Sequence, residues 1–202
     1  MGRKLYISDL HLGHKNVLAY DNRPFATIEE HDKYIIEQWN KTVNNDDTVY
    51  ILGDFIWKKE SEWYDIVSQL NGNKVLIRGN HDPKKMSAKT KSLFHYITDY
   101  DEIKDEDRNV VLCHFPITTF NRHFYGQYHL YGHVHTSFEY GMILHDRLLM
   151  EELYTRPCNM YNVGAMIDYI NYVPRTLDEI IEGFDKFNHL HKPENFNEEM
   201  HG

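Results

Sequence analysis

The chain has 202 residues, of which 41% are apolar and 26% charged, as in an ordinary soluble domain. These proportions exclude a disordered or collagen-like chain, and the sequence has no apolar run of about 18 residues, the length that a membrane-spanning helix needs. With 31 acidic and 22 basic residues the net charge is −9, which argues against a groove for duplex nucleic acid or an anionic membrane surface as the partner.

The front half of the chain alternates predicted strands with predicted helices. Short apolar or β-branched runs predict strands, whereas apolar residues at helical spacing behind a capping residue predict helices. This alternation predicts right-handed βαβ units with parallel strands. In chain order, the expected elements are a strand at 3–8, a helix at 27–43, a strand at 48–52, a helix at 60–70, a strand at 74–78 and a helix at 83–95.

The second half is predicted to consist mostly of strands and to add an antiparallel, hairpin-like portion. The last element is an amphipathic helix at 176–188, with Thr176 as its cap and Glu179 three residues later. The fold class is therefore α/β (mixed α+β), and the length predicts one domain over 1–202 whose tail is polar from about residue 192. The expected strands of this half are 109–113, 127–131, 138–143 and 159–163.

Cysteine usage and the N-terminus bear on the compartment. The two cysteines, Cys113 and Cys158, form neither a CxxC pair nor a disulfide framework. The first residues, MGRKLYISDLHLGH, lack the apolar stretch of a signal peptide. We therefore expect a cytoplasmic protein in a reducing compartment.

Histidine is unusually frequent, at 14 of 202 residues, and several histidines follow predicted strands together with carboxylates. Loops at the carboxyl ends of strands converge in one crevice of an α/β sheet. Residues i and i+2 of an extended chain project to the same side, so a pair such as Asp9 and His11 can share an ion. Five strand ends in succession therefore predict one metal site. The side chains concerned are Asp9 and His11, then Asp54, then Asn80 with His81 and Asp82, then His114, and last His133 with His135.

These motifs carry a resemblance to a known family. The series DLH at 9–11, GD at 53–54, GNHD at 79–82, LCHFP around His114 and GHVH at 132–135 resembles the calcineurin-like metallophosphoesterase superfamily. The flanking segments NRPF, TVYILGDF and LCHFPI look most like its small, capless bacterial and phage-type members. The resemblance implies a four-layer αββα sandwich of two mixed β-sheets flanked by helices, with a two-metal site at the strand ends.

The resemblance also implies roles for individual residues. His81 would stand beside the site as the acid or transition-state stabiliser, held by Asp82. One position departs from the pattern, since Trp57 stands where many members carry a second acid three residues after the GD aspartate. The implied ligands are Asp9, His11 and His135 for the first ion, Asn80, His114 and His133 for the second, and Asp54 as the bridge between them.

The donor set and the resemblance together predict a phosphoesterase with two divalent ions. Four imidazoles favour Mn²⁺ or Fe²⁺, with Zn²⁺ or Ni²⁺ as alternatives, over the oxygen-seeking Mg²⁺ and Ca²⁺. A hydroxide shared by the ions would attack a phosphodiester, or a phosphomonoester, and His81 would protonate the leaving oxygen. His14 and Arg23 are candidates for contacting the phosphate of this small substrate, for which a nucleotide is one option.

Several alternatives stay open at this point. The enzyme could be a phosphatase for nucleotides, dinucleoside polyphosphates or phosphoproteins, or a single-metal hydrolase of another substrate. A non-catalytic scaffold on the same fold is the alternative outside enzymes. The aromatic residues Trp57, Phe55, Phe115 and Tyr125 are candidates either for an apolar wall beside the substrate or for the core. The sequence leaves the oligomeric state open.

Overall fold

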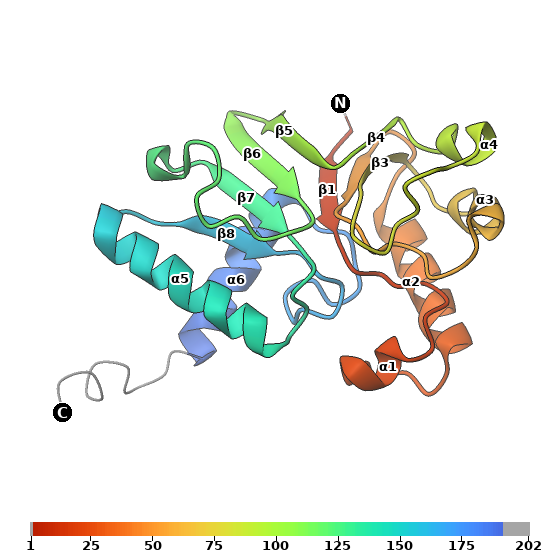
Figure 1. Cartoon of the computed structure of the whole chain (residues 1–202), viewed down its shortest axis with the longest axis horizontal. Coiled ribbons are helices and arrows are strands. Elements are labelled where there is room, and N and C mark those ends of the chain that lie inside the picture. The colour runs from red at the N-terminus through yellow and green to blue at the C-terminus, as the bar shows by residue number, and fades with distance from the viewer. Residues whose placement is uncertain (1, 192–202) are drawn as a thin grey trace.

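The computed structural model describes residues 2–191, with side chains as far as Phe187, and the predicted polar tail lies outside the described residues. Two four-stranded sheets form its centre (Figure 1). The first sheet is parallel throughout, in the order β1 (Lys4–Ile7), β2 (Thr48–Ile51), β3 (Asn73–Ile77) and β4 (Tyr96–Thr98). The second sheet follows the order β5 (Tyr100–Asp105), β6 (Arg108–Cys113), β7 (Tyr128–Tyr131) and β8 (Asn159–Asn162).

Helices flank the two sheets on their outer sides, so the predicted α/β sandwich is confirmed (Figure 1). In the second sheet β5 pairs antiparallel with β6, whereas β6, β7 and β8 run parallel. Only this sheet is therefore mixed, and the expectation of two mixed sheets is corrected for the first. The helices are α1 (Val17–Tyr20), α2 (Ile28–Thr42), α3 (Trp63–Val67), α4 (Ala88–Lys91), α5 (Phe138–Tyr154) and α6 (Leu177–His191). No helix within residues 2–191 is long and apolar enough to cross a membrane.

Local sequence accounts for the elements that were predicted correctly. The last three residues of β1 and of β2 are buried, as expected for apolar strands covered on both faces. At the start of α2, the Thr27 side chain accepts a hydrogen bond from the backbone N–H of Glu30. At the start of α6, Thr176 and Glu179 exchange side chain to backbone hydrogen bonds, which is the predicted capping box.

The predicted strand at 138–143 is wrong, because these residues begin helix α5. Ser137 caps the helix by accepting a hydrogen bond from the backbone N–H of Glu139. Tyr140 and Arg147, seven residues apart, are its buried positions, which is helical spacing. A run of six residues is too short to reveal that period. Because α5 crosses over between β7 and β8, these strands are parallel, so the antiparallel portion does not lie in the strands from 127 onward. The predicted antiparallel portion is instead the pair β5 and β6.

Other predicted boundaries also change. Of the helix expected at 83–95, only α4 is helical, and its cap is Ser87 rather than Pro83. The helix expected at 60–70 is a 3-10 turn, Glu60–Glu62, followed by α3. Strands β4 and β5 were not predicted, because β4 has three residues and β5 is a charged edge strand with alternating exposure.

The two sheets meet at the place where ligand-type residues were predicted. The backbone of Ser8, just after β1, bonds to Val163 and Ala165, just after β8. This contact brings the carboxyl ends of β1, β2 and β3 beside those of β6 and β7. Loops from both sheets therefore contribute side chains to one site.

Candidate metal centre

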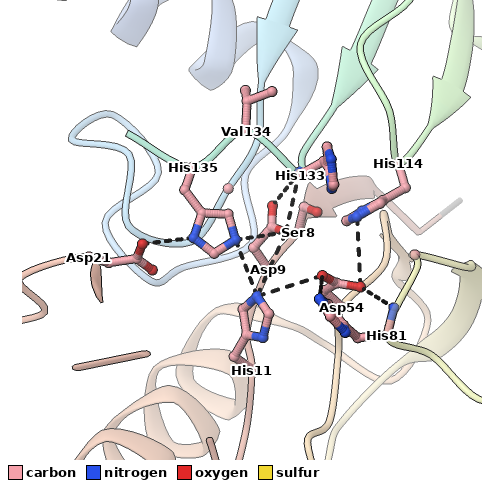
Figure 2. Close-up of polar contacts among 12 residues, drawn as sticks. Ser8, Asp9, His11, Asp21, Asp54, His81, His114, His133, Val134 and His135 are labelled. Carbon is pink, nitrogen blue, oxygen red and sulfur yellow. Dashed lines mark hydrogen bonds and ion pairs between the residues drawn. The ribbon is translucent and has the colours of Figure 1, made fainter. Parts of the chain in front are cut away.

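The first group of ligand atoms comes from Asp9, His11 and His135, which lie within 4.8 Å of one another (Figure 2). The two Nε2 atoms of His11 and His135 are 3.2 Å apart. Asp9 Oδ1 is 3.4 Å from His135 Nε2 and 4.0 Å from His11 Nε2. A carboxylate and two imidazole nitrogens, buried or nearly so, thus face a common point.

The donor chemistry of this group fits a cation. His135 Nδ1 lies 2.7 Å from Asp21 Oδ1, so Nδ1 donates its hydrogen there and Nε2 presents a lone pair to the centre. Burial opposes protonation of His135, yet its hydrogen bonds to Asp21 and Asp9 raise its pKa to about 10. The carboxylates of Asp9 and Asp21 thus favour a positive charge beside His135, and a bound metal ion would be one way to supply it. Burial lowers the pKa of His11 to about 3, which keeps it neutral, as a metal ligand must be.

The second group consists of Asp9, Asp54 and His114, whose ligand atoms also lie within 4.8 Å of one another. His114 Nδ1 is 2.7 Å from the carbonyl oxygen of Leu52, which again leaves Nε2 to face the centre. That Nε2 is 3.7 Å from Asp54 Oδ1 and 3.1 Å from Asn80 Oδ1. The rings of His114 and His133 are 5.1 Å apart. Asn80 and His133 thus border the second group.

Asp54 lies between the two groups (Figure 2). Its Oδ2 is 3.8 Å from His11 Nε2, whereas its Oδ1 is 3.7 Å from His114 Nε2. One carboxylate therefore faces both groups, which is the position of a bridging ligand. Asp9 also belongs to both groups, although the sequence placed it only in the first.

The backbone at the centre is held in an uncommon conformation. Positive φ angles cost about 1–3 kcal/mol at residues other than glycine, so other contacts must hold these turns. The N–H of Asp9 bonds to the Gly53 carbonyl at 3.0 Å, and the N–H of His133 bonds to Asp9 Oδ2 at 3.1 Å. The ligand-type residues with positive φ are Asp9 (54°), His11 (50°), Asp54 (49°), His133 (70°) and His135 (48°).

Gly132 provides the close approach between the two sheets at this centre. A Cβ atom at this position would collide with Ser8 Oγ and Asp9 Oδ2. We expect Gly132→Ala to lower the free energy of unfolding by about 1–3 kcal/mol and to weaken metal binding, because Asp9 must move. Thermal melts and metal titrations of the purified variant measure both effects. Gly141→Ala is the matched control, because a Cβ there meets nothing within 4 Å; equal losses in the two variants would contradict this account.

Arg23 lies behind the ligands rather than in front of them. Its side chain is fully buried, and its Nε and Nη2 donate to Asp21 Oδ2 at 3.0 and 2.8 Å. The remaining N–H groups point to the carbonyls of Asp9 and Leu10 and to His31 Nε2. No N–H is left for a phosphate, which corrects the predicted substrate contact. Arg23 instead fixes Asp21, which in turn orients His135.

Asp21 is a functional candidate that the sequence analysis missed, since it stands in no motif. We expect Asp21→Asn to weaken metal binding roughly 10- to 100-fold, because the amide no longer accepts the His135 Nδ1 hydrogen bond with a full charge. Titration of the metal-free protein with Mn²⁺ measures the change. The control is Asp46→Asn, an exposed carboxylate before β2, at the opposite end of the strand. An unchanged Mn²⁺ affinity in Asp21→Asn would show that Asp21 does not support metal binding.

Asp82 has a role different from the predicted one. Its buried carboxylate accepts hydrogen bonds from the N–H groups of Gly79, Asp54 and Phe55 at 2.8, 3.0 and 3.0 Å. Burial, partly opposed by these bonds, raises the pKa of Asp82 to about 6. The expected contact with the His81 imidazole is thus replaced by a clamp that ties the turn after β3 to the turn after β2.

His81 and His14 lie at the rim of the centre. The His81 side chain is 45% exposed, and its Nε2 is 3.9 Å from Asp54 Oδ2. The His14 ring stacks on Trp57 with centroids 4.1 Å apart and lies 5.5 Å from the His11 ring. Both imidazoles are therefore near the ligand-type residues; His81 is exposed, whereas His14 is half-buried.

Comparison with known proteins shows the family and the fold of this chain. The family model of calcineurin-like phosphoesterases matches residues 2–142. An uncharacterized protein of Methanocaldococcus jannaschii is 33% identical over 189 residues, covering 91% of this chain and 93% of its own length. The gene 66 protein of Mycobacterium phage L5 is 30% identical, covering 73% and 84%. A protein of unknown function from Aquifex aeolicus has a similar structure, with TM-score 0.67 and 25% identity over 90% of this chain and 99% of its own.

Proposed function

The chain belongs to the calcineurin-like phosphoesterase family, and from this premise we propose that it hydrolyses phosphodiesters with two divalent ions. The observation that carries the proposal is the pair of His/Asp groups that share Asp9, with Asp54 facing both. Two ions held there would neutralise the phosphoryl oxygens and activate a water molecule near neutral pH. Imidazole-rich coordination favours Mn²⁺ or Fe²⁺, and Zn²⁺ or Ni²⁺ also fit.

Each ion would have its own set of protein ligands. Asp21 orients His135, and Arg23 bonds to the backbone of Asp9, so these two residues would hold the ligands of the first ion in place. Asp82 holds the turn that carries Asp54. The proposed ligands are Asp9, His11 and His135 for one ion, Asn80, His114 and His133 for the other, and Asp54 between them.

The two histidines at the rim, His81 and His14, would supply the remaining chemistry. A leaving alkoxide needs a proton, and His81 stands at the rim beside Asp54 with its imidazole open to the substrate. His14, whose plane is fixed by Trp57, would donate a hydrogen bond to a phosphoryl oxygen.

The engagement of Arg23 is our reason for proposing a diester rather than a monoester. A phosphomonoester carries up to two negative charges on its terminal phosphate, whereas a diester carries one. Arg23, the guanidinium expected to meet that phosphate, is fully engaged behind the ligands. A second charge would therefore lack the bidentate arginine partner that phosphate groups commonly use.

The test uses metal-free protein prepared with a chelator. We expect no hydrolysis of bis(p-nitrophenyl) phosphate without metal, full activity after two equivalents of Mn²⁺ per chain, and a spin-coupled Mn²⁺ pair in the electron paramagnetic resonance spectrum. Turnover of p-nitrophenyl phosphate should be lower. Activity with one ion would overturn the two-metal proposal, faster monoester turnover would favour a phosphatase, and neither binding nor activity would favour a scaffold.

A further inference from the structure

Two aromatic side chains border the centre and remain largely exposed to solvent. Trp57 is 41% exposed and Phe115 is 44% exposed, whereas Phe55 is completely buried in the core. Tyr125, the fourth aromatic residue considered from the sequence, is 70% exposed and contacts Phe124 in the loop that leads into β7. Tyr125 precedes β7, at the opposite end of that strand from His133. Trp57 and Phe115 are therefore the two of these four that can meet a substrate.

Trp57 borders the first group of ligand-type residues. Its ring is 4.5 Å from the His81 ring and 6.0 Å from the His11 ring, and it stacks on His14 at an angle of 13°. Large apolar rings are normally withdrawn from water, and this one is held flat against an imidazole instead. Part of its surface is thus presented beside the proposed proton donor.

Phe115 borders the second group in a comparable way. Its ring is 4.6 Å from the His133 ring and 5.1 Å from the His114 ring, in edge-to-face arrangements. His114 is completely buried, while the neighbouring Phe115 is turned outward. The two exposed rings therefore border different parts of the centre, one on each group.

We propose that Trp57 and Phe115 are stacking platforms for two flat rings, one on each side of the scissile phosphate, so that the substrate is a short nucleotide-type phosphodiester. This inference rests on the proposed phosphodiesterase function. Base-to-aromatic stacking is available to every nucleobase, because each has a flat π-face. The net charge of −9 opposes a long polyanion and thus favours a short substrate.

The position of His81 gives the two platforms different roles. His81 would protonate the leaving oxygen, and its ring neighbour is Trp57. The departing nucleoside therefore stacks on Trp57, and the nucleoside that keeps the phosphate stacks on Phe115. Neither side needs hydrogen bonds to the base edges, so the site selects for a ring rather than for a base sequence.

The kinetic test compares a dinucleoside monophosphate with glycerophosphoethanolamine, a diester without rings. We expect kcat/KM to be higher for the dinucleotide, and Trp57→Ala to reduce that preference by roughly 5- to 100-fold, the effect of one stacked base. Trp57→Phe, which keeps a ring, should restore most of the preference. Tyr125→Ala is the matched control with an exposed aromatic residue and should leave the preference unchanged.

A binding test separates this inference from hydrolysis. Trp39 and Trp63 are completely buried, so a nucleoside monophosphate that stacks on Trp57 should quench the exposed part of the tryptophan emission. The quench should be lost in Trp57→Phe. Quenching without any hydrolysis would leave the platform proposal standing while removing the phosphodiesterase. Hydrolysis of both diesters with equal kcat/KM would overturn the platform proposal but not the phosphodiesterase. The same holds if Trp57→Ala and Phe115→Ala leave nucleotide binding unchanged.

Discussion

Replacing Asp54 by asparagine is expected to reduce phosphodiester turnover by about 10³-fold or more. Asp54 is buried and faces His11 with one oxygen and His114 with the other. An amide offers one neutral oxygen in place of two charged ones, so it cannot serve two ions together. Losing the shared ligand removes several kcal/mol of transition-state stabilisation, which corresponds to this factor in rate.

Two measurements check the Asp54→Asn result beyond the rate. Metal analysis should give fewer than two tightly held ions per chain, and the signal of a spin-coupled Mn²⁺ pair should disappear. The thermal melt should show that the variant is folded, since asparagine keeps the volume of the buried side chain. A variant with two bound ions and activity within tenfold of the parent would exclude Asp54 as the bridge.

Replacing His81 by asparagine is expected to affect substrates according to their leaving group. The imidazole is at the rim, 3.9 Å from Asp54 Oδ2, and is not among the proposed ligands, so both ions should stay bound. Loss of a general acid should reduce turnover of a diester with an alkyl leaving group by roughly 10²-fold or more. A diester that releases p-nitrophenol needs little protonation and should lose much less.

The ratio of these two turnover numbers is the readout for His81. His95→Asn is the matched control, because His95 is exposed and precedes β4, at the end of the first sheet away from the centre. Equal losses for both leaving groups in His81→Asn would assign the imidazole to binding rather than to proton transfer. Loss of bound metal in His81→Asn would instead indicate that His81 is a metal ligand.

Much of the centre could be predicted from the sequence because its residues follow strands. Asp9, Asp54 and His114 come just after three apolar strands, and parallel strands end at one edge of a sheet. A chain order that demands parallel pairing therefore brings these side chains together whatever the details of the loops. The capping box at Thr176 could also be predicted, because it depends on two residues three positions apart.

The errors occurred where local sequence is compatible with two structures. The run at 138–143 satisfies an apolar strand, and only its continuation through Tyr154 and the burial of Tyr140 and Arg147 make it a helix. Strand β5 is charged along its exposed side, so its apolar alternation is weak. Its pairing with β6, rather than its own propensity, makes it a strand.

Sequence alone thus determined the ligand-type residues and the kind of sheet that gathers them. Only the tertiary structure decided which residues support the ligand-type side chains and which surround them. The Asp21–His135 bond joins residues 114 positions apart, and the burial of Arg23 and the backbone contacts of Asp82 depend equally on loop paths. Those paths pass through positive φ angles that no local pattern demands. The net charge of −9 follows from the sequence alone. The placement of Trp57 and Phe115 beside the centre depends on how the loops fold.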